Sequence, residues 1–107
     1  MDYLEFIETT AFSALRKGLM NDDELRELQT FLIENPEKGD TISHTGGCKK
    51  IRWGRQNAGK QGGIRIIYYL RLASGRIYLL LVYPKSEKSD LTGHEKMLLR
   101  AAVQKMK

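Results

Sequence analysis

The chain has 107 residues and a mass of 12.3 kDa, which suffices for one domain with a single core, so we expect no second domain. A composition that is 41% hydrophobic and 29% charged, without repeats, is typical of globular proteins rather than disordered chains. The sequence has no apolar run of membrane-span length and no basic secretory start, so we expect one cytoplasmic domain over residues 1–107.

Charge is distributed unevenly along the chain. Residues 1–47 hold four Lys/Arg and ten Asp/Glu, a net charge of −6, whereas residues 48–107 hold fourteen and three, a net charge of +11. Such polarity favours one surface that meets a polyanion and an acidic half that faces water. Charge counting alone leaves open a basic protein with solvated lysines.

The N-terminal half predicts one strand and a helical hairpin. Residues 3–7 favour a strand, and residues 11–17 have helical spacing and stop at Gly18. A second helix begins after the capping residue Asn21 and ends before Asn35. Half of the ten acidic residues of this half lie on the second helix, so we expect the hairpin to have an acidic outer face.

The C-terminal half predicts three strands and a helix. Residues 36–47 are rich in turn-forming residues and indicate an ordered loop. Strand-like segments follow at 49–53, 63–71 and 76–83, and the last is apolar at successive positions, as in a central strand covered on both faces. Thr92 begins the last helix. The expected class is α+β in the order β-α-α-β-β-β-α, with a mainly antiparallel twisted sheet, an N-terminal helical hairpin and a C-terminal helix.

Basic side chains gather on one face of the predicted hairpin. Lys50 and Arg52 are two residues apart in a strand and therefore share a face, and an antiparallel partner strand places Arg65 across from them. Like charges opposite each other destabilise a sheet. The pattern therefore indicates either an anionic ligand or pairing with carboxylates of the helical hairpin.

Two polar segments flank these strands. Residues 54–63 form a glycine-rich loop with Arg55 and Lys60, which we expect to be a mobile contact to a phosphate backbone; a charged hairpin tip is the alternative. The segment after the last strand carries Tyr83 and further lysines. For Tyr83 a core position is favoured over base stacking, although a tyrosine there supplies both a ring face and a hydroxyl.

Metal ligands are scarce in this sequence. His44 and His94 are far apart, and Cys48 is the single cysteine, so neither a zinc site nor a disulfide is expected. His94 falls in the first turn of the last helix, where a solvated side chain is favoured over an acid or base.

Three segments in this order, residues 46–52, 62–69 and 83–91, resemble the RelE-like toxins of bacterial type II toxin–antitoxin modules, and most closely the HigB branch. The resemblance covers nearly the whole chain. It implies a RelE-like fold that enters the ribosomal A site and cleaves messenger RNA without a metal or other cofactor. It also implies a cognate HigA-like helix-turn-helix antitoxin, through which the toxin contacts operator DNA.

The resemblance also implies roles for individual basic residues. The residues that match basic positions of the family are Lys50, Arg52, Arg65, Lys85 and Lys88. Two positions depart from the family, because Ser86 stands where some relatives have arginine and Thr92 where some have a tyrosine used in the chemistry.

Cleavage by a ribose 2′-hydroxyl needs a base, an acid for the departing 5′-oxygen and cations for the developing charge. Arginine does not exchange a proton near neutrality, so Arg52 and Arg65 are expected to supply charge and Lys50 to act as the base. Lys85 or His94 is the expected acid. The residues expected to bind RNA are Lys49, Arg55, Lys60, Tyr83 and Lys88.

Two other functions stay open at this point. One is a non-catalytic toxin of the RelE/ParE fold that binds a protein such as gyrase, and the other is an inactive RNA- or DNA-binding module. A gyrase-binding relative has no need of a cationic strand face, so the basic side chains argue against the first of these.

Overall fold

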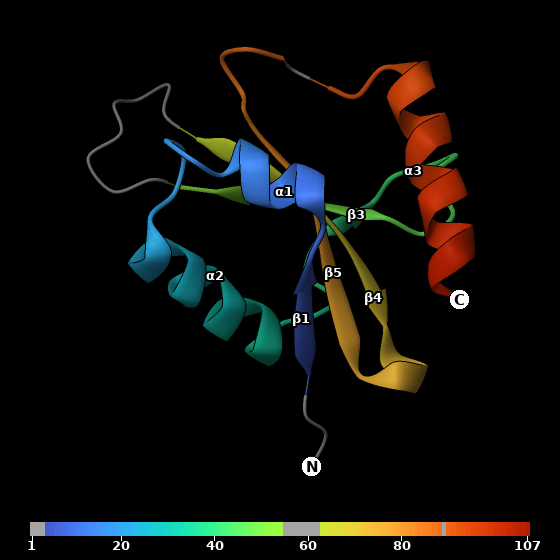
Figure 1. Cartoon of the computed structure of the whole chain (residues 1–107), viewed down its shortest axis with the longest axis horizontal. Coiled ribbons are helices and arrows are strands. Elements are labelled where there is room, and N and C mark those ends of the chain that lie inside the picture. The colour runs from blue at the N-terminus through green and yellow to red at the C-terminus, as the bar shows by residue number, and fades with distance from the viewer. Residues whose placement is uncertain (1–3, 55–62, 89) are drawn as a thin grey trace.

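The computed structural model describes residues 4–54, 63–88 and 90–107, which form a five-stranded sheet with helices on both faces (Figure 1). The elements in chain order are β1 (Glu5–Glu8), α1 (Thr10–Leu15), α2 (Asp22–Glu34), β2 (Asp40–Thr41), β3 (Lys49–Trp53), β4 (Ile64–Arg71), a 3₁₀ turn (Leu72–Ser74), β5 (Arg76–Pro84) and α3 (Gly93–Met106). The expected α+β class is confirmed. Within the described ranges, no helix is long and apolar enough to cross a membrane.

The strand order is β1-β5-β4-β3-β2, with β1 parallel to β5 and every other pair antiparallel. The middle strand is therefore β4. The apolar strand β5, expected to be central, lies between β1 and β4 instead. It is still an interior strand with both faces largely covered, which explains its continuous apolar run.

Strand β2 is the one element that the predicted order lacks, since residues 36–47 were expected to be a loop. Its two residues pair with Lys49 and Lys50, and too short a strand leaves no alternating pattern to read. Buried Tyr68 fixes the approach to β2: its hydroxyl accepts from the Gly39 N–H at 3.0 Å and donates to the Pro36 carbonyl at 2.9 Å. The remainder of β3, from Ile51 onward, has no strand on its outer side among the described residues.

The two faces of the sheet bury different helices. Helices α1 and α2 pack through Phe12, Leu28 and Leu32 on the face that carries Ile66 and Val82. Helix α3 packs on the opposite face through two residues of its own, Leu99 and Val103. Figure 1 shows α2 and α3 on opposite sides of the sheet. The sheet thus separates the acidic helical hairpin from the side chains on the face that α3 covers.

The start of α3 is held by a reciprocal capping box. The Thr92 hydroxyl accepts from the Glu95 N–H at 3.1 Å, and the Glu95 carboxylate accepts from the Thr92 N–H at 2.8 Å. We expect Thr92→Ala to lower the free energy of unfolding by about 1 kcal/mol in urea denaturation, since an alanine cap leaves a helix donor unsatisfied. Thr30→Ala on the exposed side of α2 is the control, and an equal loss in both variants would contradict a capping role.

Candidate nucleic-acid interface and active site

Three polar side chains form a row across β3, β4 and β5. Arg52 lies opposite Arg65 in the β3–β4 register, and Arg65 lies opposite Tyr83 in the β4–β5 register. Directly opposed residues of antiparallel strands point to the same face. Lys50 precedes Arg52 by two positions and shares that face, which is the face covered further along by α3.

Arg65 is buried, with 8% of the residue exposed, whereas Arg52 is exposed. Neither arginine forms an ion pair within the part of the chain that the structure describes. The pairing with helical-hairpin carboxylates left open by the sequence does not occur, because those carboxylates pair instead with Arg16 and Arg26 or face solvent behind the sheet. A buried cation without a counter-ion is unfavourable, so this row favours binding of an anion.

Lys50 has a partner that the sequence did not predict. Its Nζ lies 3.5 Å from the Asp90 carboxylate, in the segment between β5 and α3. The Leu91 N–H donates to Asp90 at 2.8 Å, and this hydrogen bond, with the charges of Lys50 and Lys96, lowers the pKa of Asp90. Asp90 therefore occupies, beside Lys50, a position that suits an anionic group of a ligand.

Tyr83 is 7% exposed, and its hydroxyl has no hydrogen-bond partner, the one such buried side-chain atom among the described residues. Burial raises the pKa of Tyr83; the charges of Asp90 and Glu95 raise it further, and only Arg65 opposes them. The hydroxyl therefore keeps its proton at neutral pH. A buried hydroxyl without a partner is unfavourable, and this one is a free donor next to a free guanidinium.

Lys88 covers the ring of Tyr83. Its ammonium lies 5.4 Å from the ring centroid and pairs with the Glu95 carboxylate. The ring face that Lys88 covers is therefore closed to a stacking base in this structure. The Tyr83 hydroxyl is influenced by the charges of Arg65, Asp90 and Glu95.

Lys85, His94 and Lys49, also predicted from sequence, are not members of this row. Lys85 is exposed directly after β5, and its backbone N–H donates to the Gly63 carbonyl at 3.1 Å. His94 is exposed in the first turn of α3. Lys49 lies on the opposite sheet face from Lys50, with its Nζ bound to the Gly39 carbonyl and the Thr41 hydroxyl. The loop prediction with Arg55 and Lys60 lies outside the described residues.

A groove of about 510 Å³ begins at the two arginines and follows the outer side of β3. The residues that line it are Phe31, Lys38, Asp40, Lys50, Ile51, Arg52 and Arg65. Nothing in the sequence pattern points to Phe31, Lys38 or Asp40 as lining residues. Phe31 reaches β3 through the packing of α2 on the sheet, and the pairing of β2 with β3 brings Asp40 to the cationic strands.

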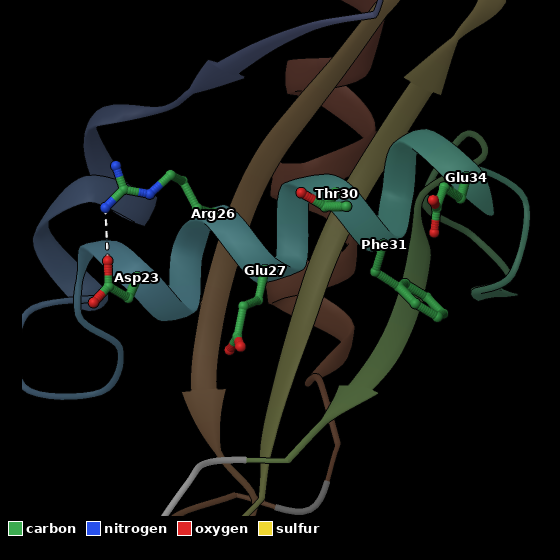
Figure 2. Close-up of a pocket in the computed structure, with 6 residues that line it drawn as sticks. All are labelled: Asp23, Arg26, Glu27, Thr30, Phe31 and Glu34. Atoms are coloured by element: carbon green, nitrogen blue, oxygen red, sulfur yellow. Dashed lines mark hydrogen bonds and ion pairs between the residues drawn. The ribbon is translucent and has the colours of Figure 1, made fainter.

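A second hollow, of about 520 Å³, lies on the outer side of α2. Figure 2 shows its lining, with Asp23 paired to Arg26 and with Glu27 and Glu34 on the same helix. Phe31 points from α2 toward β3 in this view, and its ring makes an edge contact with Trp53 at a centroid distance of 5.4 Å. The excess of carboxylates makes this hollow a poor site for a polyanion.

The residues that the structure describes offer neither a cluster of metal ligands nor a reactive thiol. No group of three or more His, Cys, Asp or Glu side chains in the described ranges is arranged to hold a metal ion. Cys48 is buried, and burial raises the pKa of its thiol to about 11 against the opposing hydrogen bond of Thr45. The thiol is therefore protonated at neutral pH and unsuited to nucleophilic chemistry.

The sequence matches no protein-family model. Among solved structures, the fold is similar to that of the E. coli toxin RelE, determined as a double arginine-to-alanine mutant in the free state. The TM-score is 0.56 at 16% sequence identity, over 83% of this chain and 90% of that chain. The likeness establishes a RelE-like fold.

Proposed function

We propose that this protein is the toxin of a type II toxin–antitoxin module, of the HigB branch of RelE-like toxins, and that it cleaves translated messenger RNA in the ribosomal A site. One observation carries the proposal: Arg65, buried and without an acidic partner among the described residues, lies between exposed Arg52 and Tyr83, whose hydroxyl also has no partner there. A phosphodiester accepts hydrogen bonds from such donors, and the RelE-like fold supports RNA as the polyanion that binds here.

In the proposed reaction the ribose 2′-oxygen attacks the adjacent phosphorus and the bond to the 5′-oxygen of the next nucleotide breaks. Negative charge grows on the non-bridging phosphate oxygens in the transition state. Arg52 and Arg65 stabilise this charge, which lets the reaction proceed without a metal ion. Burial of Arg65 strengthens its effect because the local dielectric constant is low.

Two protons must move in the same reaction. Lys50 remains the proposed base. Its Nζ lies 3.5 Å from the Asp90 carboxylate, so Asp90 must move aside before a ribose 2′-hydroxyl can reach that nitrogen. Lys85 and His94, both exposed, are the proposed acids on the solvent side of the row.

Tyr83 is proposed to contribute its hydroxyl to the reaction. Thr92 stands where some relatives have a tyrosine, but its hydroxyl is used in the capping box of α3. Tyr83 is the tyrosine that lies opposite Arg65, and its raised pKa keeps a proton available for donation to a phosphate oxygen or to the departing 5′-oxygen. We propose that it supplies this hydrogen bond.

We propose that a cognate HigA-like helix-turn-helix antitoxin neutralises the protein by covering the cationic row, and that operator DNA is contacted through that complex. Arg52 and Arg65 support this assignment: neither forms an ion pair among the described residues, and a partner that presents carboxylates would satisfy them as a phosphate does.

Primer extension on a transcript, with and without translation, tests the function. We expect discrete cuts within codons only when ribosomes translate the RNA. Uncut RNA together with inhibited DNA supercoiling would instead assign the chain to gyrase-binding toxins. Uncut RNA that is bound tightly would make it a binding module.

A further inference from the structure

The groove along β3 continues past the cationic row to a ring and a carboxylate. Phe31 is half-buried on α2 and keeps one edge against Trp53, and Asp40 is exposed on β2. Both line the groove that Arg52 and Arg65 also line. The groove volume of about 510 Å³ falls in the range of small-ligand sites, roughly 300–1,000 Å³.

Asp40 is out of place in a site for a polyanion. It lies opposite Lys50 in the β2–β3 register, yet Lys50 pairs with Asp90, and Asp40 forms no ion pair with any residue that the structure describes. A free carboxylate among cations repels a phosphate backbone and weakens its binding. A carboxylate in this position makes sense if it discriminates between ligands rather than strengthening the binding of all of them.

We propose that this groove holds one nucleotide next to the scissile phosphate and selects guanine, with the base against Phe31 and its Watson–Crick edge on Asp40. The inference rests on the proposed function, which supplies the phosphate at Arg52 and Arg65. Unpaired RNA bases are commonly read in this way, by stacking on an aromatic ring and hydrogen bonding at the Watson–Crick edge.

The chemistry of a carboxylate decides the choice of base. An ionised Asp only accepts hydrogen bonds, and its two oxygens match two adjacent donors. Guanine presents such a pair in its N1–H and its exocyclic amino group. Adenine, cytosine and uracil each place an acceptor beside their donor on this edge, so one carboxylate oxygen would face a lone pair.

Mononucleotide binding tests the groove without requiring cleavage. Trp53 is the sole tryptophan and contacts Phe31, so its fluorescence reports on a base that enters the groove. We expect GMP to bind about tenfold more tightly than AMP, CMP or UMP, as for a bidentate base contact. Asp40→Asn should abolish this preference, and Phe31→Leu should weaken all four nucleotides.

Asp23→Asn is the matched control, because it removes the same charge from an exposed position at the far end of α2. It should keep the guanine preference. Equal affinities for the four nucleotides in the unmodified protein, or an unchanged preference in Asp40→Asn, would overturn the proposal. An equal loss of affinity for all four nucleotides in Asp40→Asn would also overturn it, because the carboxylate would then contact the ribose that they share.

Mapping of cut positions separates this proposal from the proposed function. We expect guanine to be enriched at one position next to the cut with the unmodified protein and to lose its enrichment with Asp40→Asn. A protein that binds GMP selectively but leaves translated RNA intact would refute only the nuclease. A protein that cuts with no base preference in either variant would refute only the guanine site.

Discussion

Replacement of Arg65 by alanine is expected to lower translation-dependent RNA cleavage by about 10²–10³-fold, which corresponds to roughly 2.7–4 kcal/mol of transition-state stabilisation. Arg65 is 8% exposed, lies between Arg52 and Tyr83, and has no carboxylate partner in the described part of the chain. Its charge is therefore available to a phosphate in a setting where water screens it little. Single-turnover cleavage of a ribosome-bound message measures the loss.

Folding and catalysis must be separated in this experiment, because Arg65 is buried. Arg65→Met fills a similar space without charge, and thermal denaturation shows whether either variant has lost stability. Arg100→Ala, on the exposed side of α3, removes an equal charge away from the row and should cut normally. Cleavage at the unmodified rate by a folded Arg65→Ala variant would remove this arginine from the mechanism.

The layered fold explains how the acidic and basic halves of the chain coexist. The acidic helices pack on one sheet face and the cationic row lies on the other. Among the described residues, no carboxylate of α2 forms an ion pair with Arg52 or Arg65. The row therefore still attracts a polyanion.

The cationic face was predictable because strand alternation places Lys50 and Arg52 on one face and an antiparallel partner strand brings Arg65 across from them. The register confirms this shared face. Local sequence carries no comparable signal for Asp90 or Asp40. Asp90 reaches Lys50 from the segment between β5 and α3, and Asp40 reaches the groove through a two-residue strand. Such contacts depend on how distant segments pack, which periodicity does not encode.

The groove was missed for a related reason. Phe31 reads as a core residue of an amphipathic helix, and its ring does contact Trp53. Its second role, as part of the lining next to Arg52, arises because β2 covers only the first part of β3 and leaves the rest of that strand open. An edge left open by a short neighbouring strand is a property of the assembled sheet.

Replacement of Tyr83 by phenylalanine is expected to stabilise the protein while it inactivates the nuclease. The hydroxyl is buried and has no partner in the described ranges. An unsatisfied buried hydroxyl costs about 1–3 kcal/mol, so its removal should raise the free energy of unfolding by about 1 kcal/mol. If the same hydroxyl donates to the phosphate or the departing oxygen, cleavage should fall by about 10²-fold or more. Urea denaturation and single-turnover cleavage measure the two effects.

Tyr68 provides the matched comparison, because it is a second buried tyrosine and lies on the opposite face of the sheet. Its hydroxyl is satisfied by Pro36 and Gly39, so Tyr68→Phe should lower the free energy of unfolding by about 1–3 kcal/mol. The two variants are therefore expected to differ in the sign of their effect on stability. If Tyr83→Phe is more stable and keeps full activity, the Tyr83 hydroxyl is only an unsatisfied buried group with no role in cleavage. If the variant gains stability and loses cleavage, the hydroxyl is a donor kept unpaired for the substrate.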